Sequence, residues 1–173
     1  VALSHTYASE GDYMITLTAE SDVRDGDMIP ELMFNRDYTP YGFTWNKTVI
    51  KSMLTPILKM TSNMTTGRYL FQDSDELEYI CEDLFSKNPQ IYWFERTFEG
   101  CQKLNEIPEG LFSNNPDAKI FKRVFADCTA LTSIPSDLFA NNPEVTTFEE
   151  AFDGCNGLTC EIPAGLFAHN EKV

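Results

Sequence analysis

Phenylalanine, leucine and isoleucine recur with a period of 27 residues along the second half of the chain. Three blocks align, residues 94–116, 121–143 and 148–170, and they share the pattern F-x3-F-x2-C-x2-L-x2-I-P-x2-L-F-x2-N. The third block carries one extra residue near Cys160. A degenerate copy begins at Phe71, with Ser74 in place of the cysteine and Cys81 in place of the proline. The region from Gly67 to Asn170 is therefore predicted to be a tandem repeat.

The spacing within one unit predicts its local structure. The F-x3-F-x2-C segment places apolar side chains at positions i, i+4 and i+7, which is typical of one face of a short helix. The L-x2-I segment is predicted to be extended. The proline after it suits the first turn of a second short helix, whose buried side is the Leu-Phe pair. The Asn-Pro pair then ends that helix, because the residue before proline avoids the α region.

A single unit cannot enclose its own apolar side chains, so these units must stack on one another. The predicted fold class is α/β, a solenoid of short strands and short helices with a small N-terminal β hairpin as a cap. We expect three parts: residues 1–20 as a terminal hairpin, residues 21–66 as a connecting and N-terminal capping segment, and residues 67–173 as the solenoid. In the capping segment, residues 48–60 are expected to hold a strand or short helix, with Met53, Leu54, Ile57 and Leu58 on its buried side.

The net charge of the chain narrows the classes of partner that it is expected to bind. The net charge of the chain is −14, and residues 67–173 carry 19 acidic and 8 basic side chains. Nucleic acids and anionic membranes attract basic surfaces, so neither is expected as a partner. No apolar run is long enough to span a bilayer, which requires about 20 residues. There is no recognisable signal peptide, and the start at Val1 is expected to reflect a mature or trimmed chain.

The motif sequences VFADCTALTSIP and AFDGCNGLTCEIP resemble the BspA-like leucine-rich repeat family of bacterial surface proteins. The resemblance covers about 100 of the 173 residues. It departs from the family pattern in having 27 residues per repeat instead of about 23, and a shorter strand segment. The resemblance implies display at the cell surface or outside the cell, with a role in adhesion or protein binding. It also implies that Asn88, Asn115, Asn142 and Asn170 stack and bond to turn backbones, as asparagines do in other leucine-rich repeats.

The first residues show a second resemblance. The stretch HTYASEGDYMITLT, with alternation across Tyr13, Ile15 and Leu17, is similar to the final hairpin of a PKD-type immunoglobulin-like domain. A complete domain of that kind needs roughly 100 residues. Two interpretations stay open: the rest of the domain lies upstream, or the hairpin stands alone as a cap.

No group of residues predicts catalysis, a cofactor or a metal. Cys101, Cys128 and Cys155 occupy one slot of successive repeats, which favours buried structural thiols over a nucleophile. A disulfide between Cys155 and Cys160 stays open, because spacing alone cannot establish it. His5 and His169 have no partners for a triad or a zinc site. Asp22, Asp25 and Asp27 are predicted to form a solvated turn, with calcium binding as the alternative.

The positions that vary between repeats are the candidate binding residues. In the extended segments they are Glu78, Tyr79, Asn105, Glu106, Thr132 and Ser133, and the pair Tyr92 and Trp93 is added because it breaks the repeat phase. The predicted function is a non-enzymatic extracellular or cell-surface module that binds a protein or glycan. The alternatives are a structural spacer within a larger bacterial surface protein and, third, a carbohydrate-active or peptide hydrolase.

Overall fold

The computed structural model describes residues 36–39, 42–45, 51–57, 59, 65–159 and 161–173. Its strands are β1 (Arg36–Thr39), β2 (Gly42–Trp45), β3 (Ser52–Met53) and β4 (Tyr79–Ile80). Strands β1 and β2 form an antiparallel pair with Arg36 opposite Trp45, and β3 pairs in parallel with β4. The described residues contain no helix.

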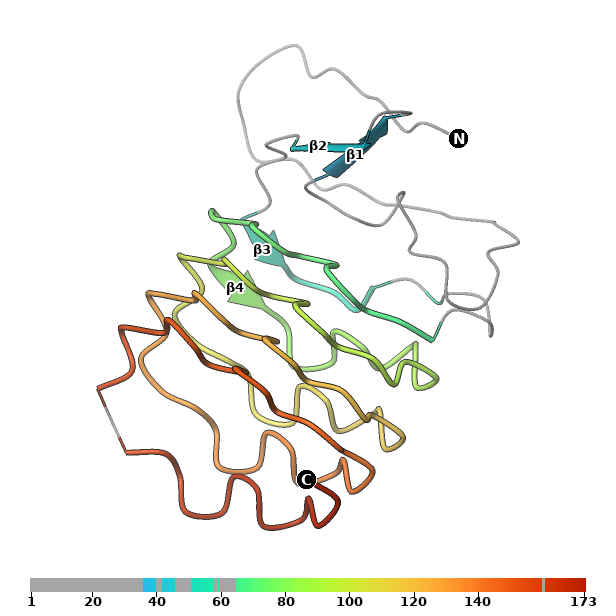
Figure 1. Cartoon of the computed structure of the whole chain (residues 1–173), viewed down its shortest axis with the longest axis vertical. Coiled ribbons are helices and arrows are strands. Elements are labelled where there is room, and N and C mark those ends of the chain that lie inside the picture. The colour runs from blue at the N-terminus through green and yellow to red at the C-terminus, as the bar shows by residue number, and fades with distance from the viewer. Residues whose placement is uncertain (1–35, 40–41, 46–50, 58, 60–64, 160) are drawn as a thin grey trace.

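The repeat units form coils that stack in parallel. Isolated parallel bridges join Thr66 to Trp93, Trp93 to Ile120 and Ile120 to Thr147, one residue from each coil. In Figure 1 the coils lie one beneath another, from the green coil that follows β3 to the red coil at the C-terminus. Equivalent residues of neighbouring units are therefore neighbours in space.

The predicted α/β solenoid of short strands and short helices is wrong, because turns stand where helices were expected. In the F-x3-F-x2-C segment, Arg96 and Gly100 have φ values of 54° and 74°, which no α-helix contains. The N–H groups of Phe94, Arg96, Phe98 and Gly100 donate to carbonyls of the next coil at 2.8–2.9 Å. A helix would use these groups internally, four residues back. The second predicted helix is also replaced by turns. Their hydrogen bonds reach three residues back, as from the Asn115 N–H to the Phe112 carbonyl.

Residues in the left-handed conformation, with a positive φ, recur in every unit and explain why glycine and aspartate occur at these positions. Positive φ values occur at Tyr69 and Asp73, Arg123 and Asp127, and Glu150 and Gly154, in phase with Arg96 and Gly100. Glycine and aspartate are among the residues that tolerate this conformation. A Cβ at Gly100 would also collide with the side chain of Asp73 in the preceding coil. The repeated use of left-handed residues stops the chain from continuing as a helix.

The apolar pattern predicted the core correctly even though it predicted the wrong backbone. Phe94, Phe98, Phe121 and Phe125 are fully buried, and the leucines of the repeat are buried in every unit except the last, where Leu158 is only partly buried. Equivalent rings stack between coils: Phe94 lies 5.3 Å from Phe121 at an interplanar angle of 4°, and Phe98 lies 5.2 Å from Phe125 at 3°. Such pairs stabilise by about 0.5–1.5 kcal/mol beyond the burial of their area. These ring stacks run along the axis of the coils.

The asparagines form a second stack in the core. Asn115 and Asn142 are fully buried, and Asn170 is nearly so. Each donates its side-chain N–H to the main-chain carbonyl of the asparagine one unit earlier, at 2.8 Å. The structure thus places these amides on turn backbones, as the resemblance implied.

The N-terminal predictions have mixed outcomes. Ile57 is buried, and Met53 packs against the core from β3. Leu54 is 69% exposed, so its predicted burial is wrong: Met53 of β3 packs against the core, and the next side chain along an extended segment points to the opposite face. Leu58, the predicted hairpin at residues 1–20 and the aspartates near Gly26 lie outside the described residues. Strands β1 and β2, within residues 21–66, were not predicted.

Candidate binding surface

Six of the predicted binding residues form a band of exposed side chains across successive coils, which we call the variable lane. Its members are Glu78, Tyr79, Asn105, Glu106, Thr132 and Ser133, and all six are exposed. Buried leucine and isoleucine flank each pair, so the backbone is held from below while the pair faces solvent. The N–H and hydroxyl of Thr132 both donate to the Asn105 carbonyl at 3.3 Å, which joins two coils within the lane.

The variable lane opens into a hollow of about 590 Å³ between the β4 coil and the next one. Its lining contains five carboxylates and no basic side chain: Glu78, Tyr79, Ile80, Cys81, Glu82, Asp83, Asn105, Glu106, Pro108 and Glu109. The volume falls within the range of ligand-binding clefts. Tyr79, at 52% exposure, contributes an exposed aromatic ring at this hollow. Four of the predicted residues are therefore brought together at one concave site.

Tyr92 and Trp93 do not join this hollow. Trp93 is half-buried, its indole N–H donates to Glu95 Oε2 at 3.0 Å, and the guanidinium of Arg68 lies 4.3 Å from its ring centroid. Tyr92 is also half-buried, with Lys119 Nζ 5.8 Å from its ring centroid. The pair is engaged in contacts within the chain, and the structure separates it from the other six residues.

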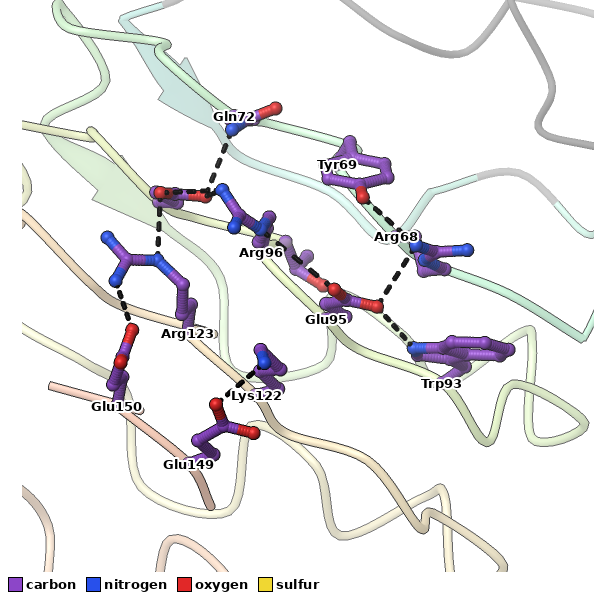
Figure 2. A network of polar contacts seen from close by, with 12 residues as sticks. Arg68, Tyr69, Gln72, Trp93, Glu95, Arg96, Lys122, Arg123, Glu149 and Glu150 are labelled. Atoms are coloured by element: carbon purple, nitrogen blue, oxygen red, sulfur yellow. Dashed lines mark hydrogen bonds and ion pairs between the residues drawn. The ribbon is translucent and has the colours of Figure 1, made fainter. Parts of the chain in front are cut away.

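A network of charged side chains crosses the coils on the turn segments and was not predicted (Figure 2). At its centre Glu99, only 7% exposed, accepts hydrogen bonds from Gln72 at 3.0 Å, Arg96 at 2.9 Å and Arg123 at 3.0 Å. Arg123 also pairs with Glu150, and this bond together with the one to Glu99 raises the pKa of its guanidinium. The sequence signal was a charged residue in the same slot of three successive repeats, Arg96, Arg123 and Glu150.

The charged groups of this network form ion pairs with one another. Lys122 forms an ion pair with Glu149 at 2.7 Å, and Arg68 pairs with Glu95 at 3.1 Å. A partner would have to displace these contacts before it could use the same groups. We therefore assign the network a role in holding successive coils together, and we do not include it in the binding surface.

The cysteines form a third stack between coils. The thiols of Cys101, Cys128 and Cys155 donate to the carbonyls of Phe71, Phe98 and Phe125 at 3.0–3.2 Å. Burial raises the pKa of Cys155 to about 11 and holds those of Cys101 and Cys128 above their usual value. Cys155 carries a free thiol, and Cys160 lies outside the described residues. The arrangement is that of structural thiols, since reactive cysteines need a lowered pKa and access.

We expect Cys101 and Cys128 to resist labelling by a disulfide reagent at pH 8 in the folded protein and to react at once after unfolding in urea. Stability should also fall at alkaline pH. A thiol whose pKa is higher in the folded state stabilises that state below its unfolded pKa, near 9, and the contribution is lost as pH rises towards 11. The variant Cys155→Ser keeps a hydroxyl donor but does not titrate. Its stability should therefore fall less than that of the parent protein as pH rises from 9 to 11. Rapid labelling of Cys101 in the folded state would contradict this account.

Among the described residues, no group of three or more His, Cys, Asp or Glu side chains could hold a metal ion. The same part of the chain contains no helix of the length and apolar character needed to cross a membrane. His169 is exposed near the C-terminus.

Comparison with known proteins gives no relative from which a function can be inferred. No protein-family model matches the chain, and neither the curated proteins nor the solved structures provide a match.

Proposed function

We propose that this protein is a non-enzymatic interaction module that binds a ligand through the variable lane and its hollow. The observation that carries the proposal is a contrast between buried and exposed positions. In the coils before the last one, the framework phenylalanines, leucines, asparagines and cysteines repeat and are buried, whereas the lane residues change from coil to coil and are exposed. Differing exposed side chains on a rigid repeated frame are the usual binding surface of repeat proteins.

The chemistry of the hollow favours a protein ligand over a glycan. Five carboxylates line it without a basic side chain, and Tyr79 provides an aromatic surface. Lysine and arginine on a partner protein could form charge-assisted hydrogen bonds with these carboxylates, and arginine could also lie over the Tyr79 ring. A glycan would use the same tyrosine for stacking but would leave most of the negative charge without a counter-charge.

The proposed location is the cell surface or the extracellular space. This part of the proposal is supported by the resemblance to BspA-like surface proteins, carried by motifs such as VFADCTALTSIP. A role as a spacer within a larger surface protein is the alternative outcome of the binding experiment below.

The test is to screen the full chain on arrays of proteins and glycans and to repeat each positive interaction with variants. Replacing Glu106 by glutamine and Tyr79 by serine together should weaken binding at least tenfold, which corresponds to about 1.4 kcal/mol. Thermal stability should not change, because both side chains are exposed. Asp117→Asn, which removes an exposed carboxylate away from the hollow, is the matched control and should bind normally. Binding that survives substitution of all six lane residues would show that the lane is wrongly assigned.

A further inference from the structure

The variable lane lacks main-chain hydrogen bonds between the β4 coil and the coil that follows it. Where the next two coils meet, the Ala130 N–H donates to the Gln102 carbonyl at 3.2 Å. The Thr132 N–H donates to the Asn105 carbonyl at 3.3 Å. The equivalent donors one unit earlier are the N–H groups of Lys103 and Asn105, and neither has an acceptor among the described residues. We call this unpaired stretch of the lane the seam.

The seam is a local interruption in an otherwise bonded stack. On its N-terminal side, β3 pairs in parallel with β4, and the Cys81 N–H donates to the Met53 carbonyl at 2.9 Å. The two coils that border the seam are joined at their turn segments, where the N–H groups of Phe71 and Asp73 donate to the following coil at 2.8 and 2.7 Å. The coils are therefore held together on one side and left unpaired at the lane.

The free main-chain groups face one another across the hollow. The Asn105 N–H occupies the slot of the Thr132 N–H, which points to the preceding coil. The Glu78 carbonyl occupies the slot of the Asn105 carbonyl, which accepts from the following coil, but no N–H of that coil donates to it. Both Glu78 and Asn105 line the hollow of about 590 Å³. Unpaired main-chain groups along an extended segment are a template for pairing with another chain.

The side chains of the hollow form an apolar floor with an acidic rim. Ile80 and Cys81 line the hollow and are buried. The carboxylates of the rim are all on exposed residues: Glu78, Glu82, Asp83, Glu106 and Glu109. Successive side chains of an extended chain point to opposite faces. An extended segment with alternating small apolar and basic side chains therefore matches both the floor and the rim.

We propose that the seam binds an extended segment of a partner protein, which enters the hollow and pairs with the free main-chain groups. A carbonyl of the segment accepts from the Asn105 N–H, and one of its N–H groups donates to the Glu78 carbonyl. Small apolar side chains lie over the floor, and lysine or arginine alternates with them along the rim. This mode of recognition is strand addition, in which main-chain bonds provide affinity and side chains provide specificity. The inference rests on the proposed function, because it names the partner of the same surface.

The free main-chain groups favour this occupant over a helix or a glycan. A helix offers no main-chain donors or acceptors along its length, because they are bonded within the helix. A glycan has hydroxyl groups that can form hydrogen bonds, but it has no row of positive charges for the rim. An extended basic segment supplies both kinds of contact.

The probe for this proposal is the capped peptide KVKVKVK, in which valine and lysine alternate as the floor and the rim require. Titration calorimetry with the full chain measures its Kd. In the saturated complex, amide hydrogen exchange at Asn105 should slow by ~10-fold or more, because its N–H gains an acceptor. Thr132 occupies the same slot one coil later and is already bonded, so its exchange should not change.

Two matched peptides keep every charge and side chain but carry N-methyl groups, one on its lysines and the other on its valines. Because successive N–H groups of a strand point to opposite edges, one of these peptides cannot donate to the Glu78 carbonyl. That peptide should bind at least ~10-fold more weakly than the unmodified one. Equal affinity of all three peptides would overturn the inference, as would unchanged exchange at Asn105 or no binding at about 1 mM.

The double variant with Glu106→Gln and Tyr79→Ser separates this inference from the proposed function, because it leaves the main chain of the seam intact. Weaker binding of an array ligand by this variant, without any effect of N-methylation on the peptide, would show that the hollow acts through side chains only. The proposed function would then stand and strand addition would be wrong. If the variant bound every array ligand as the parent protein does and N-methylation had no effect, both would be wrong.

Discussion

Replacing Phe112 by alanine is expected to lower the free energy of unfolding by about 3–5 kcal/mol, the usual cost of removing a buried ring. Phe112 is fully buried where the ring stacks meet. Its ring contacts are Phe85 at 5.7 Å, Phe94 at 4.9 Å, Phe121 at 4.7 Å, Phe125 at 6.2 Å and Phe139 at 6.0 Å. These rings come from several units, so the cavity would weaken contacts between coils as well as within one. Urea unfolding followed by circular dichroism measures the loss.

Phe167→Ala is the control for this prediction, because it removes the same ring from the same repeat slot at the end of the stack. Phe167 is 42% exposed, so we expect a loss of only about 1 kcal/mol from its partial burial. Equal losses at Phe112 and Phe167 would contradict the account in which the rings act through burial between neighbouring coils.

Replacing Asn142 by aspartate is expected to cost about 3–5 kcal/mol at neutral pH, the range for an uncompensated buried charge. The Asn142 amide is fully buried and donates to the carbonyls of Phe112 at 3.0 Å and Asn115 at 2.8 Å. Its oxygen accepts no hydrogen bond from the described part of the chain. An ionised carboxylate would lose both donated bonds and place its charge beside two carbonyl oxygens. The measurement is urea unfolding of the variant and the parent protein over a range of pH.

The destabilisation caused by Asn142→Asp should increase with pH. Burial raises the pKa of the introduced carboxyl in the folded state above its unfolded value of about 3.9. The protonated form can still donate a hydrogen bond, so the difference from the parent protein should be small below about pH 4 and should grow as pH rises. Asn141→Asp is the matched control, since Asn141 is adjacent and exposed, and its effect should stay within about 0.5 kcal/mol at every pH. A loss of stability in Asn142→Asp that did not depend on pH would contradict the hydrogen bonds assigned to Asn142.

The sequence predicted which side chains are buried far better than it predicted the backbone that buries them. The spacing Phe94, Phe98, Cys101 indicated one buried face, and all three residues are fully buried. The same spacing arises from successive turns with left-handed residues at Arg96 and Gly100, so periodicity could not distinguish these turns from a helix. The direction of the main-chain hydrogen bonds decides between the two, and that direction is set by the neighbouring coil.

The sequence predicted the exposed residues of the candidate site but not the hollow that gathers them. Exposed positions between the framework residues Leu77 and Ile80 follow from the repeat, so Glu78 and Tyr79 could be selected from the sequence. The hollow that gathers them with Asn105 and Glu106 depends on how two coils stack, which the repeat pattern does not specify. Trp93 was selected because the pair Tyr92 and Trp93 breaks the repeat phase, but a break in phase does not reveal that Trp93 already contacts Arg68 and Glu95.

Hydrogen exchange at individual amides tests most directly the central claim that turns pass their hydrogen bonds from each coil to the next. The account predicts slow exchange at Phe125 and Asp127, which donate to the following coil, and fast exchange at the equivalent Phe152 and Gly154. Ala151 and Asp153, whose bonds are local, should stay protected and so exclude fraying of the whole last coil. Equal protection of Phe152 and Phe125 would indicate bonds within each unit, as in a helix, and would contradict the account.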